Sequence, residues 1–123
     1  MRVITGSARG RRLITLEGES VRPTTDKVKE AMFSAIQFEI EGRTVLDLFA
    51  GSGQLGIEAL SRGAKEVYFI DSAAVSIRAV RENLKSTGLE ANARVVNMPF
   101  SAFLKSTRAT FDIAILDPPY NYK

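Results

Sequence analysis

One stretch of the chain decides the fold: Thr44-Val45-Leu46-Asp47-Leu48-Phe49-Ala50-Gly51-Ser52-Gly53. Its apolar part, residues 44–49, predicts a buried strand. The segment that follows, residues 54–62, predicts a short helix that ends at Gly63. Glycines at such a handover allow the backbone to approach a ligand closely, in conformations that other residues resist. The stretch therefore predicts a strand, a binding turn and a helix in direct succession.

The same alternation continues along the chain. We expect further strands at residues 66–71, 94–97 and 111–116, a helix at residues 73–86 and a helical turn at residues 99–104. On the helix at 73–86, four apolar side chains are spaced to face inward: Val75, Ile77, Val80 and Leu84. Strands separated by helices indicate βαβ units, a parallel sheet and right-handed crossovers. The predicted fold class is α/β, with a Rossmann-like parallel sheet.

The amino-terminal part has a different pattern. Residues 2–5 and 11–16 predict a β-hairpin around a turn at residues 6–10, and residues 26–40 predict an amphipathic helix. The expected inner face of that helix consists of Val28, Met32, Ala35 and Ile36. We therefore expect two units, a basic hairpin and loop at residues 1–25 and a partial α/β domain at residues 26–123.

Composition excludes several classes of chemistry. The chain has 123 residues, 45% of them hydrophobic, and contains neither cysteine nor histidine. This excludes disulfides, thiol nucleophiles, histidine bases and almost any zinc site, so we expect no metal. No apolar run approaches the roughly 20 residues of a membrane span, and no signal-peptide pattern is evident. We expect a cytoplasmic protein with no membrane partner.

Positive charge is concentrated at the start of the chain. The net charge of the whole chain is +3. Residues 1–29 hold seven basic side chains, Arg2, Arg9, Arg11, Arg12, Arg22, Lys27 and Lys29, against three acidic ones, Glu17, Glu19 and Asp26. A basic segment on a nearly neutral body indicates a polyanionic partner such as nucleic acid. A solvated surface hairpin is the alternative.

The glycine turn also predicts a nucleoside-containing cofactor. It holds the pattern Gly51-x-Gly53-x-x-Gly56, and Asp71 follows Gly51 by 20 residues, at the end of the next strand. A carboxylate there can accept hydrogen bonds from ribose hydroxyls. Asp47, four residues before Gly51, would repel a pyrophosphate and attract an ammonium group. This favours S-adenosylmethionine; a dinucleotide or a turn without a ligand remains possible.

The last predicted strand runs into Asp117-Pro118-Pro119-Tyr120. Each proline has a fixed φ and lacks an N–H, so the carbonyls and the Asp117 carboxylate are acceptors in a stiff turn. Such acceptors can bind both protons of an exocyclic amine, and Tyr120 offers a ring on which a base can stack. The motif therefore favours methylation of an amino group on a base, against the simpler interpretation of a proline-rich turn.

The strand before this motif, Ile113-Ala114-Ile115-Leu116, is apolar on both faces. An exposed apolar edge strand invites aggregation. We therefore expect the chain to be either a fragment of a longer protein or one completed by another segment or subunit.

With these elements in order, the chain resembles the bacterial 16S ribosomal RNA guanine-N2 methyltransferase family of the RsmD type. The resemblance covers essentially all residues and has four parts: Arg2-Val3-Ile4-Thr5-Gly6 with Arg9-Gly10-Arg11-Arg12-Leu13; Arg22-Pro23-Thr24-Thr25-Asp26-Lys27-Val28-Lys29-Glu30; Asp47 to Gly53; and Asp117 to Tyr120. It implies an S-adenosylmethionine-dependent methyltransferase fold with the first four strands present, and further strands after them in family members.

The resemblance also implies residue roles. It assigns cofactor binding to Asp47, Phe49, Ala50, Gly51, Gly53, Asp71, Ser72, Phe100 and Ser101, and contact with the target guanine to Asp117, Pro118, Pro119 and Tyr120. Contact with RNA falls on Arg2, Arg9, Arg11, Arg12, Arg22, Thr24 and Lys27. The implied activity is methyl transfer to the N2 amine of a guanine in 16S ribosomal RNA, free or in the small ribosomal subunit, by a monomer.

Other functions remain open at this point. A DNA amino-methyltransferase uses a similar Pro-Pro-Tyr motif. The chain could also be a catalytically incomplete fragment that binds cofactor or RNA, a non-catalytic nucleic-acid binder that keeps the fold, or a dinucleotide oxidoreductase.

Overall fold

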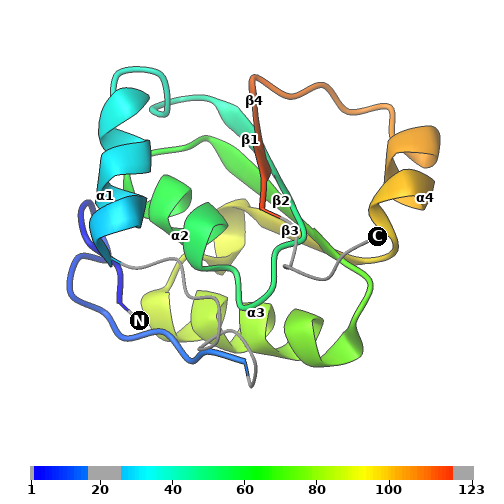
Figure 1. Ribbon diagram of the computed structural model, residues 1–123, viewed down its shortest axis with the longest axis horizontal. Helices are drawn as coiled ribbons and strands as arrows, with labels where there is room; N and C mark the ends of the chain where they lie inside the picture. Colours follow the sequence, from blue (N-terminus) through cyan, green and yellow to red (C-terminus); the bar gives the residue numbers. More distant parts are fainter. Residues whose placement is uncertain (1, 17–25, 118–123) are drawn as a thin grey trace.

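A computed structural model describes residues 2–16 and 26–117. Within them lies a four-stranded parallel sheet in the order β3-β2-β1-β4 (Figure 1). The strands are β1 (Thr44–Leu48), β2 (Glu66–Asp71), β3 (Ala93–Asn97) and β4 (Ile113–Leu116). Because β2 and β3 lie on one side of β1 and β4 on the other, the strand order reverses between β1 and β4. Open α/β sheets bind ligands at such a switch point, beyond the carboxyl ends of the strands.

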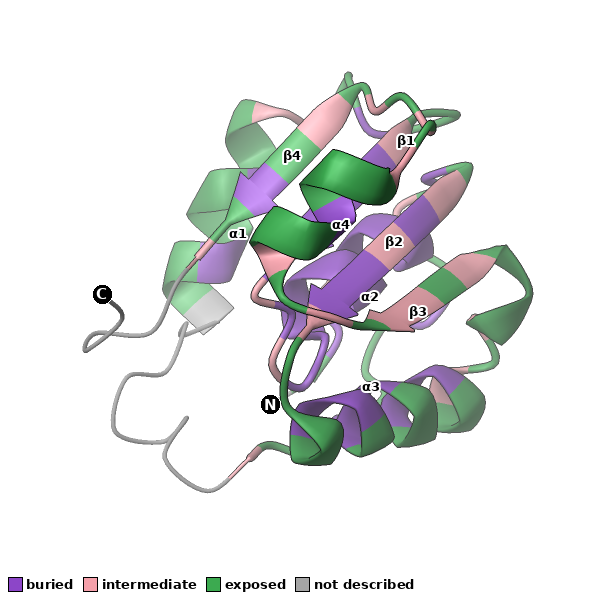
Figure 2. Ribbon diagram, turned by 90° about the vertical axis from the view of Figure 1, so that its right-hand side faces the viewer, coloured by how far each residue is buried: buried purple, intermediate pink, exposed green. Residues whose placement is uncertain are grey.

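Helices cover both faces of the sheet (Figure 2). The helices α2 (Gln54–Ser61) and α3 (Ala74–Thr87) lie on one face, and α4 (Phe100–Ser106) lies on the other. The helix α1 (Asp26–Ala35) lies near α2, and a short 3-10 turn, η2 (Glu90–Asn92), leads into β3. None of the helices in the described ranges is long and apolar enough to cross a membrane. The predicted α/β class and parallel sheet are confirmed.

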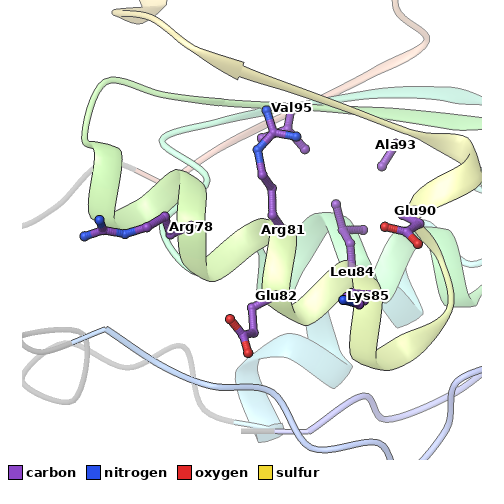
Figure 3. A pocket seen from close by; sticks show the side chains of 8 residues that line it. All are labelled: Arg78, Arg81, Glu82, Leu84, Lys85, Glu90, Ala93 and Val95. Carbon is purple, nitrogen blue, oxygen red and sulfur yellow. The ribbon is translucent and has the colours of Figure 1, made fainter.

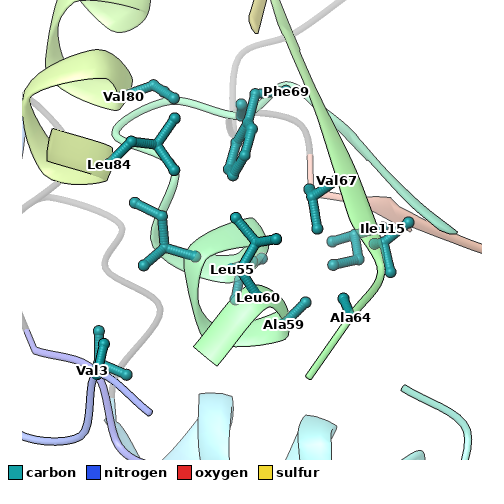
Figure 4. Packing of buried hydrophobic residues seen from close by; sticks show 14 of the residues in the cluster. Val3, Leu55, Ala59, Leu60, Ala64, Val67, Phe69, Val80, Leu84 and Ile115 are labelled. Carbon is teal, nitrogen blue, oxygen red and sulfur yellow. The ribbon is translucent and has the colours of Figure 1, made fainter. Parts of the chain in front are cut away.

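Alternation along the strands creates two apolar clusters. Val67 and Phe69 of β2 join the larger cluster, with side chains of α2 and α3 (Figure 4). Ile70 joins the smaller cluster, which packs against Phe103 of α4. Successive side chains of a strand point to opposite faces. On β1, Leu46 and Leu48 therefore face α4, and the residue between them faces α2. That residue is Asp47, so the alternation itself places a carboxyl group under the glycine turn.

The predicted helix at residues 26–40 is shorter and turned differently. It ends at Ala35, and Val28 and Met32 are 54% and 37% exposed rather than buried. The buried side chains of α1 are instead Lys29 and Phe33, both fully buried. Lys29 Nζ donates to the Arg2 carbonyl at 2.8 Å, so a long-range polar contact rotates the helix away from its most apolar face. The prediction of the buried face of α1 was therefore wrong.

One further expectation about an apolar face, the inward position of Val75, needs correction. Val75, in the first turn of α3, is 53% exposed, because it lies outside the contact between α3 and the sheet. On β4, Ile115 is buried but Leu116 is 64% exposed. Among the described residues β4 is an edge strand of the sheet, and its exposed Leu116 agrees with the apolar edge expected from the sequence.

The amino-terminal segment is not a regular hairpin. Its antiparallel pairing among the described residues consists of one bridge, between Arg2 and Arg12. The Val3 N–H donates to the Arg11 carbonyl at 2.9 Å, and the Gly10 N–H donates to the Val3 carbonyl at 2.9 Å. Val3 is buried in the larger apolar cluster (Figure 4). The segment is thus held by packing on α2 more than by strand pairing.

Candidate functional site

The glycine turn between β1 and α2 adopts backbone conformations with positive φ. Phe49 has a φ of 59°, Gly51 of 59° and Gly53 of 84°. The Ala50 N–H donates to the Ile70 carbonyl at 3.0 Å, so the turn is fixed to the end of β2. A non-glycine residue rarely adopts a positive φ, and when it does the strain often marks a functional site. Phe49 is the only such residue within the described ranges.

Asp47 lies directly beneath this turn. It is only 2% exposed, and its Oδ2 accepts a hydrogen bond from the Gly56 N–H at 3.1 Å. Gly56 must be glycine here, because a Cβ would lie 2.3 Å from Phe69 Cε2 and 3.0 Å from Asp47 Oδ2. The third glycine of the pattern therefore makes room for the carboxyl group and for the packing of α2 on β2.

Burial raises the pKa of Asp47 from 3.8 to about 8, although the hydrogen bond from Gly56 opposes this shift. The negative charges of Asp117 and Asp71 raise the pKa further. In the free protein the Asp47 carboxyl group is thus mostly protonated at neutral pH. The sequence predicted a negatively charged Asp47. A cation beside this carboxyl group would lower its pKa and favour that charged form.

Asp71 ties the turn to the next strand. Its Oδ2 accepts from the Gly51 N–H at 2.9 Å, and its Oδ1 accepts from the Ala73 N–H at 2.9 Å. The side-chain amide of Asn97, at the end of β3, lies 3.1 Å from the Ser72 carbonyl and donates to it when the amide is turned so that its nitrogen faces this acceptor. The role of Asp71 toward a ribose stays a prediction from sequence; in the structure its carboxylate shapes the turn.

Two aromatic side chains meet beside these carboxyl groups. The rings of Phe49 and Phe100 lie 5.1 Å apart at 48°. Phe100 begins α4 just after β3, so the contact bridges the loops that follow β1 and β3. The structure therefore brings together these two predicted cofactor residues. Ser101 directly follows Phe100, Ser72 directly follows Asp71, and both serines are exposed.

The three carboxyl groups of the site come from three adjacent strands. Asp47 lies near the end of β1, Asp71 ends β2 and Asp117 follows β4, and the charges of the latter two act on Asp47. Among the described residues, no group of three or more acidic side chains is arranged to hold a metal ion. The three carboxyl groups thus gather at the carboxyl ends of adjacent strands. The predicted residues Pro118, Pro119 and Tyr120 lie outside the described ranges.

Sequence reasoning missed three polar residues near this site. Gln54, the first residue of α2, is 8% exposed, and its Oε1 is the one buried side-chain oxygen or nitrogen in the described residues that lacks a hydrogen-bond partner. Asn83 and Glu58 are buried as well. A polar residue on the buried face of a helix signals a partner elsewhere in the fold. Asn83 stands between the inward-facing Val80 and Leu84 in the sequence, so that signal was available.

Glu58 of α2 fixes the basic amino-terminal segment. Its carboxylate oxygens accept from the N–H groups of Ile4 at 2.9 Å and Thr5 at 3.0 Å. Arg62 Nε donates to Glu58 at 2.8 Å, and Lys29 Nζ lies 3.4 Å from it. The predicted RNA-contacting residues in the described ranges are exposed: Arg2, Arg9, Arg11, Arg12 and Lys27. Arg22 and Thr24 lie outside those ranges.

A separate groove opens between α3 and the strand β3 (Figure 3). The residues that line it follow the glycine turn in the sequence and do not include it. The groove has a volume of about 550 Å³ and is lined by Arg78, Arg81, Glu82, Leu84, Lys85, Glu90, Ala93 and Val95. Its walls contain none of the predicted site residues. We therefore place the candidate site at the carboxyl ends of the strands, where the carboxyl groups converge.

Comparison with known proteins adds independent information. The chain matches the family described as "Conserved hypothetical protein 95" over residues 1–123. It is 40% identical to "Ribosomal RNA small subunit methyltransferase D" of Haemophilus influenzae, with 99% of this chain and 65% of the relative covered. It is 39% identical to the Escherichia coli protein of the same name, with 98% and 60% covered. The chain thus spans less than two thirds of the length of these two relatives.

Among solved structures, the chain resembles "Putative methyltransferase yhhF from Escherichia coli" with a TM-score of 0.87 and 39% identity, covering 98% of this chain and 65% of that one. The fold is therefore that of a methyltransferase, with four parallel strands in the described part of the sheet.

Proposed function

The chain belongs to the family described as Conserved hypothetical protein 95, and from this premise we propose that it serves S-adenosylmethionine-dependent methylation of 16S ribosomal RNA. The proposed acceptor is the exocyclic N2 amine of a guanine. The names of the relatives in Haemophilus influenzae and Escherichia coli support the class of RNA. The guanine and its N2 atom rest on the resemblance in the four sequence motifs.

The observation that carries the proposal is the set of carboxyl groups around the glycine turn. Asp47 is buried beneath the turn, and the Asp71 carboxylate already accepts from the Gly51 N–H of the turn, which disfavours a diphosphate at that N–H. An ammonium beside Asp47 would favour its charged form. Gln54 Oε1, a buried acceptor without a partner at the start of α2, suits a donor from the same ligand. The residues present therefore fit S-adenosylmethionine better than a dinucleotide.

Each part of the site has a proposed role. Asp47 and Gln54 would hold the amino-acid end of the cofactor, together with Ala50, Gly51 and Gly53 of the turn. Asp71 and Ser72 would hold its ribose, and the remaining predicted contacts to its adenine are Phe49, Phe100 and Ser101. The ring contact at 5.1 Å supports an aromatic wall on that side.

S-adenosylmethionine would supply a methyl group bound to a sulfonium, which is already a good leaving group. The chain therefore has to position the acceptor more than activate it. Asp117 would accept a hydrogen bond from the target amine and stabilise the positive charge that develops on it. Together with the Pro118 carbonyl and the Tyr120 ring, proposed from sequence, it would hold the unstacked base.

The amino-terminal segment would bind RNA phosphates. Arg9, Arg11 and Arg12 are exposed on a backbone that Glu58 and the apolar cluster hold in place. Contacts from arginine to phosphate fix the orientation of a nucleic acid without reading its sequence. Specificity for one guanine would then come from the shape of the RNA. We propose that the chain acts as a monomer in this complex.

The decisive assay is methyl transfer from radiolabelled S-adenosylmethionine to naked DNA, free 16S ribosomal RNA or 30S particles, followed by nucleoside analysis. We expect labelled N2-methylguanine from the RNA or the particles. Label in DNA would support the DNA amino-methyltransferase instead. Cofactor binding without label in any of them would support a binding function alone.

The RNA surface is tested separately through the salt dependence of binding. The slope of log K against log salt is negative for RNA binding. Replacing Arg11 and Arg12 with alanine should make it less steep by about 1 for each phosphate that is no longer bound. The matched control replaces Lys105 and Arg108, which are exposed cations near the end of α4, and should leave the slope unchanged. Equal slopes in both double variants would remove the amino-terminal segment from the interface.

A further inference from the structure

Asn83 of α3 connects two parts of the molecule that the proposed function uses separately. The residue is 1% exposed. Its Oδ1 accepts from the Ile14 N–H at 2.8 Å, and its Nδ2 donates to the Ile14 carbonyl at 3.0 Å. The same Nδ2 donates to the Ser52 carbonyl at 2.9 Å. One side chain thus binds the amino-terminal segment and the middle of the glycine turn.

The geometry makes this connection specific. The pair of bonds to Ile14 satisfies both backbone groups of one residue, as a neighbouring strand would. Ser52 is fully buried, so its carbonyl depends on a protein donor. The amide of Asn83 has two N–H groups and one oxygen, and all of them are used by these contacts. A shift of Ile14 therefore moves the amide that holds the Ser52 carbonyl, or breaks a buried hydrogen bond, which is unfavourable.

The other polar anchors of the segment bind residues 2–8 rather than the region of Ile14: Lys29 binds the Arg2 carbonyl, and Ser61 binds Thr5 and Ala8. Glu58 of α2 binds Ile4 and Thr5, and these bonds also hold the start of the segment. Asn83 therefore stands out as a link between Arg11 and Arg12, which precede Ile14 by two to three residues, and Ser52 of the cofactor turn.

We propose that Asn83 is a positioning residue that couples RNA binding at the amino-terminal segment to cofactor binding at the glycine turn. The proposal rests on the proposed function, because it needs both ligands. When RNA holds the segment, Asn83 keeps the Ser52 carbonyl, and with it the turn, in its binding arrangement. By thermodynamic linkage the cofactor then tightens RNA binding by the same factor as RNA tightens cofactor binding.

The first experiment measures this factor in the unmodified chain. The dissociation constant of S-adenosylhomocysteine is determined by calorimetry with and without a saturating RNA hairpin of about 30 nucleotides, and the reciprocal titration is performed. We expect a tightening of about 5-fold or more, the same in both directions. Binding of both ligands with a factor of one would overturn the coupling and leave the proposed function intact. Absence of either binding event would overturn both.

Variants then assign the factor to Asn83. Asn83→Ala removes the three side-chain bonds. Asn83→Asp keeps the acceptor for the Ile14 N–H but loses the donors to the Ile14 and Ser52 carbonyls. Both should bring the factor close to one, whatever they do to the melting temperature. Ser86→Ala is the matched control, since Ser86 lies on the same helix and its hydroxyl donates to the Asn83 backbone carbonyl at 3.2 Å without involving the Asn83 amide. A factor that stays at the wild-type value in a folded Asn83 variant would overturn the proposal.

A measurement without substitution covers the case in which both variants unfold. Saturation with S-adenosylhomocysteine should slow hydrogen exchange at the Ile14 amide, which Asn83 binds, by several-fold. The Thr107 amide, bonded to the Phe103 carbonyl at the end of α4, should exchange at an unchanged rate. Equal exchange of the Ile14 amide in the free and saturated protein would overturn the coupling.

Discussion

Replacing Asp47 with asparagine should stabilise the free protein at pH 8 and weaken its binding of the cofactor. The asparagine oxygen can still accept the hydrogen bond from the Gly56 N–H, which lies 3.1 Å from Oδ2 in the wild type. The substitution keeps the shape of the side chain and removes its titration. It therefore separates the cost of a buried carboxyl group from its use in binding.

The magnitude follows from the pKa. The pKa of Asp47 rises from 3.8 in the unfolded chain to about 8 in the fold, through burial and the charges of Asp117 and Asp71. Between these values the folded state binds more protons than the unfolded state, so stability falls as pH rises. The slope approaches about 1.4 kcal/mol per pH unit, and the full range of about four units corresponds to about 6 kcal/mol. The contribution of Asp47 to stability is therefore greatest below about pH 4 and is lost above about pH 8.

The chain offers a favourable window for this measurement. It has no histidine and no cysteine, so few other groups titrate between pH 6 and pH 8. Urea unfolding should show that the wild type loses about 2 kcal/mol across this window and that Asp47→Asn loses almost none. Asp112→Asn, at an exposed position before β4, serves as the control and should retain the wild-type slope. Identical slopes for wild type and Asp47→Asn would refute the assignment of the titration to Asp47.

Cofactor binding provides the second half of the test. An ammonium beside Asp47 should expel its proton, so S-adenosylhomocysteine binding at pH 7 should release most of one proton per ligand. Calorimetry in buffers of different ionisation enthalpy measures this number. Asp47→Asn should release none and bind at least about 10-fold more weakly, since a hydrogen bond to a charged group contributes about 1.5–3 kcal/mol. Equal affinity and equal proton release in both proteins would show that Asp47 does not meet the ligand.

Three other substitutions test separate parts of the molecule. Gly56→Ala places a Cβ 2.3 Å from Phe69 Cε2 and should cost about 1–3 kcal/mol of unfolding free energy in urea; a neutral result would mean that α2 packs more loosely on β2. Glu58→Gln leaves the fully buried Lys29 without its carboxylate and should cost about 3–5 kcal/mol, measured by thermal unfolding; a decrease below about 1 kcal/mol would contradict a buried ion pair. Asp117→Ala should lower kcat in the methylation assay far more than it weakens cofactor binding, and equal effects on both would remove Asp117 from the amine.

Local sequence patterns predicted the part of the site whose elements are consecutive in the chain. The strand at 44–48, the glycine turn and the helix that starts at Gln54 follow one another in the chain, so periodicity and glycine placement were sufficient. The bounds of β2, Glu66–Asp71, agree with the predicted strand. Gly88 has a φ of 73° directly after α3, as expected for a helix end.

Contacts between distant residues account for the failures. The inner face of α1 depends on Lys29 reaching Arg2 and Glu58, 27 and 29 positions away, which outweighs the apolar Val28 and Met32. The amino-terminal segment looked like a hairpin, yet its backbone is bound by Glu58 and Asn83 across more than 50 positions of sequence. A pattern within one segment carries no information about such partners. The protonation of Asp47 was missed for the same reason, since it depends on burial by the whole fold.

The central claim is that the carboxyl groups around the glycine turn select a cofactor with an ammonium group over one with a diphosphate. Parallel calorimetric titrations of the chain with S-adenosylhomocysteine and with NAD at pH 7 test it most directly. We predict saturable binding of S-adenosylhomocysteine with release of a proton, and no measurable heat from NAD. Saturable binding of NAD, or no measurable heat from S-adenosylhomocysteine in a folded sample, would contradict the claim.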